Sequence, residues 1–305
     1  MKKCGKLFLL LLLVIVASAC NTETLGKETK ELELKIGLMP AVDAAPILLA
    51  KEKGYFDELG LQLEATIYTN ANNRQSALQT GELDGTMTDL IAFINNHHNG
   101  FKTKIVNSTD GSFAFLINNH FNENGQKKVG LMEVSVANYL TDYYIAPMYD
   151  IEKVFIPDIP TRLEMINNGK LDIAFIPEPV ASMGQLNGLE KLVTLTDDDG
   201  YMPEAMVFRE DAINKKSEAI ALFIEGYNRA VEDIKADESL ARDILIKEIE
   251  LNSEINQLID LPEYKKARVP SESYLNKVID WVEDVQGIEV DFKYNDMVDN
   301  RFTQS

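Results

Sequence analysis

Short apolar runs alternate with segments of helical periodicity along most of the chain, and this alternation constrains the fold more than any other feature. Residues 34–39 and 62–68 are suited to buried strands, and residues 46–59 between them carry apolar side chains at helical spacing. Strand, helix and strand in this order are typical of parallel βα units. The sequence therefore predicts an α/β protein with mixed, mostly parallel sheets and, from residue 212 onward, a helical C-terminal region.

The same pattern occurs twice. Residues 78–87 (Leu-x-x-Gly-Glu-Leu-Asp-x-Thr-Met) are similar to residues 165–175 (Met-x-x-x-Gly-Lys-Leu-Asp-x-Ala-Phe). In each copy a helix ends at a glycine that can adopt the left-handed cap, and a short apolar strand follows. Turn-rich residues 118–125 and 197–201 are suited to two crossovers between lobes. We expect lobe I to comprise residues 33–118 plus 203–305, lobe II to comprise residues 119–202, and a cleft to lie between them.

The first residues indicate export. Three lysines precede an apolar run at residues 7–16, and small residues 17–19 follow immediately before Cys20. This order predicts a signal peptide over residues 1–19, and the run is short for a permanent span, which needs about 20 apolar residues. The cysteine resembles a bacterial lipobox, which implies lipid attachment at Cys20 and a polar linker over residues 20–32. An ordinary secretory signal and an uncleaved anchor remain alternatives.

Composition excludes several classes of partner. Without residues 1–19 the chain has 27 basic against 49 acidic residues, a net charge of −22, which disfavours nucleic acid as a partner. No cysteine besides Cys20 remains, so no disulfide is expected. The three histidines lack a metal-ligand spacing, and phosphate-loop, nucleophile-elbow and dinucleotide motifs are missing from the sequence. We expect no metal, no cofactor and no enzymatic activity.

Polar residues follow several of the predicted strands. Ligands of open parallel sheets bind beyond the carboxyl ends of strands, where loops and helix N-termini meet. Any one of these residues alone could be a helix cap or a turn residue, but their common edge predicts a binding site. The candidate ligand-binding residues are Asp43, Asn70, Asn72, Thr88, Asp89, Ser108, Ser135, Glu178 and Tyr201.

Several of these segments occur in a recognisable order. They are Ile36-Gly37-Leu38, the run Ala-Pro-Ile-Leu-Leu-Ala-Lys-Glu-Lys-Gly-Tyr-Phe at residues 45–56, the repeat unit at residues 77–84, and Pro177-Glu178-Pro179. Together they resemble the periplasmic-binding-protein family of thiamine-pyrimidine, nitrate and sulfonate receptors. The resemblance implies a two-lobe type II fold that clamps a small molecule and delivers it to an ABC permease. With Cys20, it implies a monomer lipid-anchored to the outer face of the cell membrane.

The charges near the predicted site favour one class of ligand. A dense anion would normally be bound by several basic groups, and these loops carry Arg74 alone among several carboxylates. We therefore expect a neutral or cationic heterocycle, with Tyr201 or Tyr68 stacking on its ring. Within the resembled family, a thiamine-precursor-like pyrimidine fits this expectation. The alternatives are a sulfonate- or nitrate-type anion receptor, an enzyme of vitamin-precursor metabolism on the same fold, and a surface adhesin or sensor.

Overall fold

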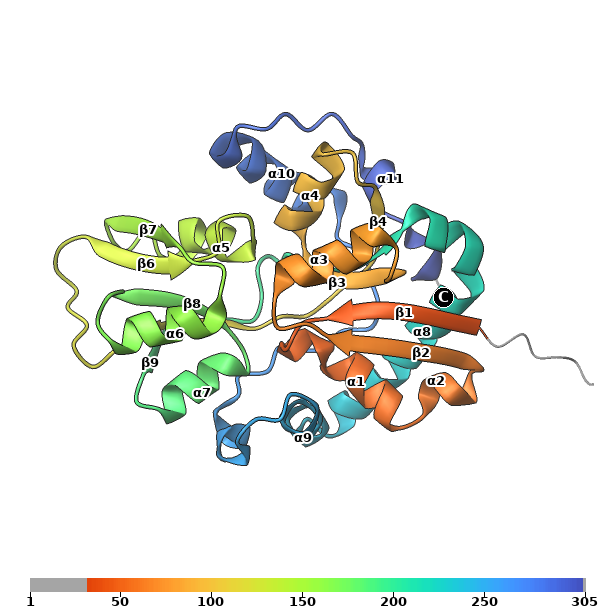
Figure 1. Ribbon diagram of the computed structural model, residues 1–305, viewed down its shortest axis with the longest axis horizontal. Helices are drawn as coiled ribbons and strands as arrows, with labels where there is room; N and C mark the ends of the chain where they lie inside the picture. The colour runs from red at the N-terminus through yellow and green to blue at the C-terminus, as the bar shows by residue number, and fades with distance from the viewer. Residues whose placement is uncertain (1–31, 304–305) are drawn as a thin grey trace, which may run out of the picture. The chain divides into compact units, whose positions relative to one another are not determined.

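The computed structural model describes residues 32–303 (Figure 1). The predicted signal peptide, Cys20 and nearly all of the predicted linker lie outside these residues. Within the described part, no helix is both long and apolar enough to cross a membrane. The described chain is organised around two five-stranded sheets, which confirms the mixed α/β class.

The first sheet has the strand order β2-β1-β3-β10-β4. Strands β1, β2 and β3 are mutually parallel, and β10 runs antiparallel to both of its neighbours. Four of the five strands therefore share one direction, as predicted. The strands are β1 (Leu32–Leu38), β2 (Leu61–Ile67), β3 (Gly85–Asp89), β4 (Thr103–Ser108) and β10 (Glu204–Arg209).

The second sheet repeats this plan with the order β7-β6-β8-β5-β9. Here β5 is the strand that runs antiparallel to both neighbours, β8 and β9. The similar pattern of the two sheets accounts for the sequence similarity between residues 78–87 and 165–175, which lead into β3 and β8. The strands are β5 (Phe113–Ile117), β6 (Lys127–Leu131), β7 (Ile151–Phe155), β8 (Ile173–Pro177) and β9 (Glu190–Leu195).

The position of β5 corrects the predicted lobe boundary at residue 118. Phe113–Ile117 is apolar and buried at every position, which suits a strand covered on both faces, and it pairs with β8 and β9 in the second sheet. The chain therefore changes sheets at residues 109–112 rather than at residues 118–125. The latter form a turn-rich connection from β5 to β6 within the second sheet.

Helices cover the sheets and connect their strands. Near the first sheet lie η1 (Val42–Ala44), α1 (Ala45–Glu52), α2 (Tyr55–Glu58), α3 (Ala71–Thr80), α4 (Leu90–His98), α8 (Glu210–Ala236) and α9 (Ser239–Glu248). The second sheet carries α5 (Val136–Tyr144), α6 (Ile159–Asn167) and α7 (Val180–Leu186). The C-terminal part adds η2 (Ser253–Leu258), α10 (Glu272–Gln286), α11 (Tyr294–Met297) and η3 (Asn300–Phe302).

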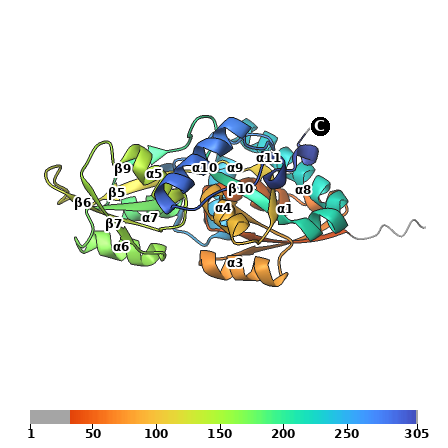
Figure 2. The ribbon, with the colours of Figure 1, turned by 90° about the horizontal axis from the view of Figure 1, so that it is seen from above.

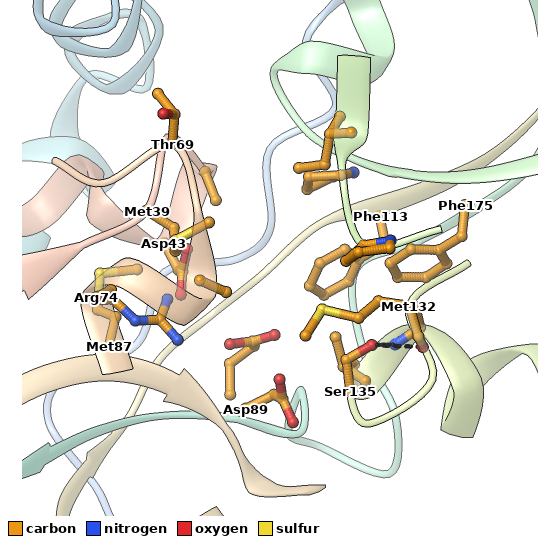
Figure 3. Close-up of a pocket in the computed structure, with 18 of the residues that line it drawn as sticks. Met39, Asp43, Thr69, Arg74, Met87, Asp89, Phe113, Met132, Ser135 and Phe175 are labelled. Atoms are coloured by element: carbon orange, nitrogen blue, oxygen red, sulfur yellow. Dashed lines mark hydrogen bonds between the residues drawn. The ribbon is translucent and has the colours of Figure 1, made fainter. Parts of the chain in front are cut away.

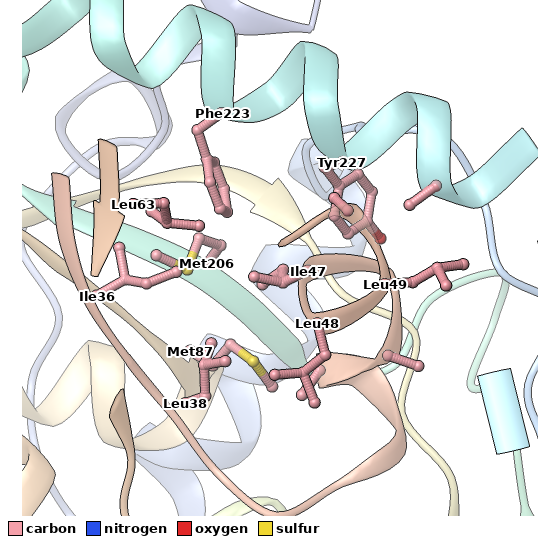
Figure 4. Packing of buried hydrophobic residues seen from close by; sticks show 14 of the residues in the cluster. Ile36, Leu38, Ile47, Leu48, Leu49, Leu63, Met87, Met206, Phe223 and Tyr227 are labelled. Carbon is pink, nitrogen blue, oxygen red and sulfur yellow. The ribbon is translucent and has the colours of Figure 1, made fainter. Parts of the chain in front are cut away.

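The largest hydrophobic core lies between the first sheet and the helices α1 and α8. Figure 4 shows Phe223 and Tyr227 of α8 pointing toward Leu63, Met206 and Ile47. Phe223, Met206 and Ile47 are fully buried, and each such side chain contributes about 1.5–3 kcal/mol relative to an exposed one. This core holds the first sheet rigid, so the loops at its strand ends can carry a binding site.

The C-terminal part packs against elements of both sheets. Helix α10 contacts α4, and the two helices lie side by side in Figures 1 and 2. The short helix η2 contacts α7, which follows β8 of the second sheet. From the sequence we assigned the segment after β10 to the first lobe. In the structure this segment contacts helices of both lobes.

Candidate functional site

A cavity of about 120 Å³ lies at the carboxyl ends of strands from both sheets (Figure 3). Met39, Asp43, Arg74 and Asp89 are among the residues that line it on the side of the first sheet, and the second sheet contributes a facing wall. Neither sheet forms the cavity alone. This is the cleft that the two-lobe prediction requires, at the predicted edge of the strands.

Four helices begin at this cavity, and each is capped by a side chain that satisfies a free backbone N–H group. Their partially positive N-termini make the surroundings of the cavity favourable for oxygen atoms and anions. The N-cap contacts are Asn70 to the Asn72 N–H (2.9 Å) for α3, Asp89 to Ala92 (2.7 Å) for α4, Ser135 to Ala137 (3.1 Å) for α5 and Asp158 to Thr161 (2.9 Å) for α6.

The first wall carries three carboxyl groups around one guanidinium group. Asp43 and Arg74 are buried, and Glu204 is the direct cross-strand partner of Asp89 in the β3–β10 ladder. Cross-strand partners of this kind have Cβ atoms about 5 Å apart. In Figure 3, Asp43 lies beside Arg74, whose guanidinium group points toward the space that Asp89 borders. The wall is therefore strongly acidic, with one internal cation.

Burial disfavours the ionised form of all three carboxyl groups. It raises the pKa of Asp43 to about 6, against a hydrogen bond of 2.9 Å that Asp43 accepts from the Thr109 hydroxyl. Burial also raises the pKa of Asp89 to about 6. The pKa of Glu204 lies well above its usual range because of burial and of the charges on the two aspartates. Asp43 and Asp89 can therefore exchange protons at about pH 6.

The facing wall is apolar and carries one buried cation. The rings of Phe113 and Phe175 stack with centroids 5.0 Å apart, and Met132 lies beside them in Figure 3. Arg162, in the first turns of α6, is 3% exposed, and its Nη1 donates to the Ile156 carbonyl at 2.7 Å. Burial lowers the pKa of Arg162 to about 10. Among residues 32–303, no carboxylate oxygen lies within 4.0 Å of its guanidinium group.

The structure brings together three of the nine predicted site residues, namely Asp43, Asp89 and Ser135, which all line the cavity. Thr88 does not line it, because successive side chains of a strand point to opposite faces and its neighbours Met87 and Asp89 face the cavity. The position at the end of a strand therefore predicted which residues lie near the cavity. It did not predict which of the two faces of the strand each side chain is on.

The other predicted residues make contacts outside the cavity lining, and their part in ligand binding stays a prediction. Asn70 caps α3, Asn72 lies in the exposed first turn of that helix, and Ser108 is buried in β4. Glu178 is fully buried in an ion pair with Lys191. Tyr201 stacks on Tyr274 with centroids 4.9 Å apart, and Tyr68 packs on the small cluster of Ala77, Leu78 and Leu83.

Sequence reasoning missed the aromatic pair and two charged residues. Phe113 and Phe175, rather than Tyr201 or Tyr68, present rings to the cavity. Glu204 could be found only from the antiparallel register that places it opposite Asp89. Arg162 gave one signal, since an arginine near a helix N-terminus stands where the helix dipole disfavours a cation. An arginine in this position can indicate that an anionic group binds there.

Comparisons with known proteins can now be added. The sequence profile of the NMT1-like family matches residues 27–138. A comparison with curated protein sequences gives no match. Among solved structures, the ligand-binding component of an ABC-type import system from Staphylococcus aureus, with zinc bound, is 17% identical and superposes with a TM-score of 0.77, covering 89% of this chain and 97% of that one.

Two further structures show what this fold supports. The alkanesulfonate-binding protein SsuA from Xanthomonas axonopodis pv. citri, bound to MOPS, is 14% identical, with a TM-score of 0.75 over 88% of this chain and 98% of that one. The desulfurization enzyme DSZB is 11% identical, with a TM-score of 0.66 over 88% and 97%. The predicted likeness in fold to periplasmic binding proteins is thus confirmed. Because an enzyme shares the fold, activity must be argued from the cavity.

Proposed function

We propose that the protein is an extracytoplasmic solute-binding protein of an ABC importer that captures a small neutral or cationic heterocycle, such as a thiamine-precursor-like pyrimidine. The observation that carries this proposal is the group of three carboxyls, Asp43, Asp89 and Glu204, that face one cavity between two lobes. Buried carboxylates are stabilised by a cation or by N–H donors, and the ligand would supply them.

Cavity size and lining support a ligand of about one ring. The volume of about 120 Å³ is close to the roughly 150 Å³ of an apolar cavity that accommodates benzene. The stacked rings of Phe113 and Phe175, with Met39, Met87 and Met132, offer an apolar surface for such a ring. Within residues 32–303 no group of three or more His, Cys, Asp or Glu side chains is arranged to hold a metal ion.

A second candidate is a sulfonate- or nitrate-type anion receptor. The four helix N-termini around the cavity favour it, as does the pair of buried arginines, Arg74 and Arg162. An enzyme on this fold is the third candidate, although the lining includes neither cysteine nor histidine to act as nucleophile or base. We place the heterocycle first because Arg74 already faces three carboxyl groups.

The first experiment identifies the ligand. Small molecules released from the denatured protein are identified by mass spectrometry, and a thermal-shift screen then compares pyrimidines, sulfonates and inorganic anions. A ligand at a hundredfold excess over its Kd stabilises the native state by about 2.7 kcal/mol, which gives a clear shift. A hit confined to sulfonates or nitrate would replace the heterocycle proposal with the second candidate.

The pH dependence of binding separates the same two ligand classes. Asp43 and Asp89, whose pKa values burial raises to about 6, must lose protons to bind a cation. For each carboxyl that must ionise, the affinity for a cationic ligand should fall about tenfold from pH 7 to pH 5. An anionic ligand should bind more tightly at pH 5. Titration calorimetry in buffers of different ionisation enthalpy measures the linked protons, and Glu204→Gln should reduce their number.

Stability of the unliganded protein should change with pH in the opposite sense. A carboxyl group with a raised native pKa holds its proton between about pH 4 and 6, where the unfolded chain has lost it. The contribution of Asp43 and Asp89 to the free energy of unfolding therefore decreases as pH rises through this window. Comparing melting curves of the wild type and Asp43→Asn at pH 4.5 and 7 isolates this contribution. A variant with an unchanged pH dependence would contradict it.

We further propose that the protein acts as a monomer that lipid on Cys20 tethers to the outer face of the membrane, where it meets the permease. The small residues before Cys20 and the polar linker after it support this tether. Cys20→Ala should release the protein from the membrane fraction or block its maturation, as seen by fractionation and intact mass. Membrane association and a cleavage site that both persist in the variant would refute the tether.

A further inference from the structure

The two walls of the cavity differ in charge. The wall of the first sheet carries Asp43, Asp89 and Glu204 around Arg74, whereas on the facing wall Arg162 is the only charged lining residue of the described part of the chain. Because the cavity accommodates about one ring, a bound molecule would touch both walls at once. The two ends of a bound ligand would therefore meet walls of different charge.

Arg162 is a buried cation that forms no ion pair within 4.0 Å with any carboxylate of residues 32–303, although Asp158 interacts with its charge at longer range. Among the described residues, the one hydrogen bond of the Arg162 side chain goes to the Ile156 carbonyl, and its buried Nε has no partner. Asp158, the N-cap of α6, is exposed and accepts from the Thr161 N–H (2.9 Å) and hydroxyl (2.6 Å). Buried charges in proteins are normally paired, because an unpaired one is costly to desolvate. An anionic group of the ligand could provide the close counter-ion that the described residues do not supply to Arg162.

A second observation shows that negative charge is favourable near this wall. Val136, the first residue of α5, lines the cavity, so the partially positive N-terminus of this helix borders it. Asp89 of the first sheet lines the same cavity as this N-terminus. An oxygen-bearing ligand group could be bound by the N-terminus of α5 together with Arg162.

We propose that the ligand is dipolar, with an amine or other N–H donor end against Asp43 and Glu204 and a carboxylate, sulfonate or similar acceptor end against Arg162. This inference rests on the proposed function, because it assigns the second end of the same ligand. Arg162 becomes the residue that selects ligands with an acceptor over simple amines. The apolar middle of the ligand lies against the rings of Phe113 and Phe175.

Four one-ring probes test the two ends separately: benzylamine, benzoate, 3-aminomethylbenzoate and 4-aminomethylbenzoate. We expect at least one aminomethylbenzoate to bind at least tenfold more tightly than benzylamine, as measured by calorimetry, because a hydrogen-bonded charge is gained. In Arg162→Met this advantage should disappear, and benzylamine should bind at least as tightly as it does to the wild type, because a like charge has been removed from the cavity. Lys170→Met removes an exposed cation just after α6 and should keep the advantage.

The outcomes distinguish the inference from the proposed function. Equal binding of benzylamine and both aminomethylbenzoates, or an advantage that survives in Arg162→Met, overturns the dipolar ligand but leaves a cation receptor intact. Benzoate binding more tightly than benzylamine overturns the cation preference itself. Failure of all probes overturns the dipolar ligand, and the screen of natural compounds then decides the function alone. Should Arg162→Met fold poorly, Arg162→Lys, which keeps the charge but loses the planar fork, should retain part of the advantage.

Discussion

Replacing Asp198 with alanine should cost about 3–5 kcal/mol of unfolding free energy, because it removes the shared acceptor of a buried network. Asp198 is 2% exposed and accepts hydrogen bonds from the hydroxyls of Tyr139 (3.0 Å), Tyr144 (2.9 Å) and Tyr274 (2.9 Å). Lys277 Nζ lies 3.1 Å from its second oxygen. Without the carboxylate, these donors lose their common partner in a site that water reaches poorly.

Denaturant unfolding of Asp198→Ala measures this loss, and Asp197→Ala is the matched control. Asp197 is the neighbouring residue, but its side chain is 52% exposed and its ion pair with Lys265 is long, at 3.5 Å. The control should therefore change the unfolding free energy by less than about 1 kcal/mol. Similar losses in the two variants would show that the crossover, rather than the tyrosine network, is the sensitive feature.

The network also joins parts of the chain that a hinge motion would separate. Asp198 lies in the second crossover, Tyr139 and Tyr144 belong to α5 of the second lobe, and Tyr274 belongs to α10, which packs on α4 of the first lobe. If the cleft opens, α10 must move together with α5, because otherwise the hydrogen bonds from their tyrosines to Asp198 would break. The network thus limits which relative motions of the lobes have a low free-energy cost.

Much of the fold could be predicted because its signals are local. The alternation of apolar runs and helical periods specifies βα units, and the repeated Gly-x-Leu-Asp pattern reports two similar halves. The lobe boundary depended on information that is not local. Phe113–Ile117 follows the first lobe's last parallel strand in sequence, and only its pairing with β8 and β9 places it in the second sheet.

The site was partly predictable for a related reason. Asp43, Asp89 and Ser135 follow strands or begin helices, and such positions meet at one edge of a parallel sheet. Glu204 depends on an antiparallel register between residues 115 positions apart in sequence, and its partnership with Asp89 leaves no local pattern. Polar positions at strand ends also serve as caps and as buried ion pairs, which is the case for Asn70 and Glu178.

Glu178→Gln should therefore destabilise the protein by about 3 kcal/mol and leave ligand affinity within about twofold of the wild type. The sequence led us to expect the reverse, since Glu178 stands between two prolines after a strand. In the structure it is fully buried, pairs with Lys191, and accepts hydrogen bonds from the Ser182 hydroxyl (2.8 Å) and N–H (3.1 Å). Neutralising it leaves the Lys191 ammonium group, which is also largely buried, without its buried counter-ion.

The matched control is Asp260→Asn, which removes the other carboxylate on Lys191. Asp260 lies 2.8 Å from the same ammonium group, but its side chain is 47% exposed, so its loss should cost less than about 1 kcal/mol. Melting curves and calorimetric titration of both variants separate stability from binding. A loss of tenfold or more in ligand affinity in Glu178→Gln, with an unchanged melting temperature, would return Glu178 to the binding site. The buried pair predicts the opposite, because its contacts join α7 and β9 to the last residue of η2 and lie outside the cavity lining.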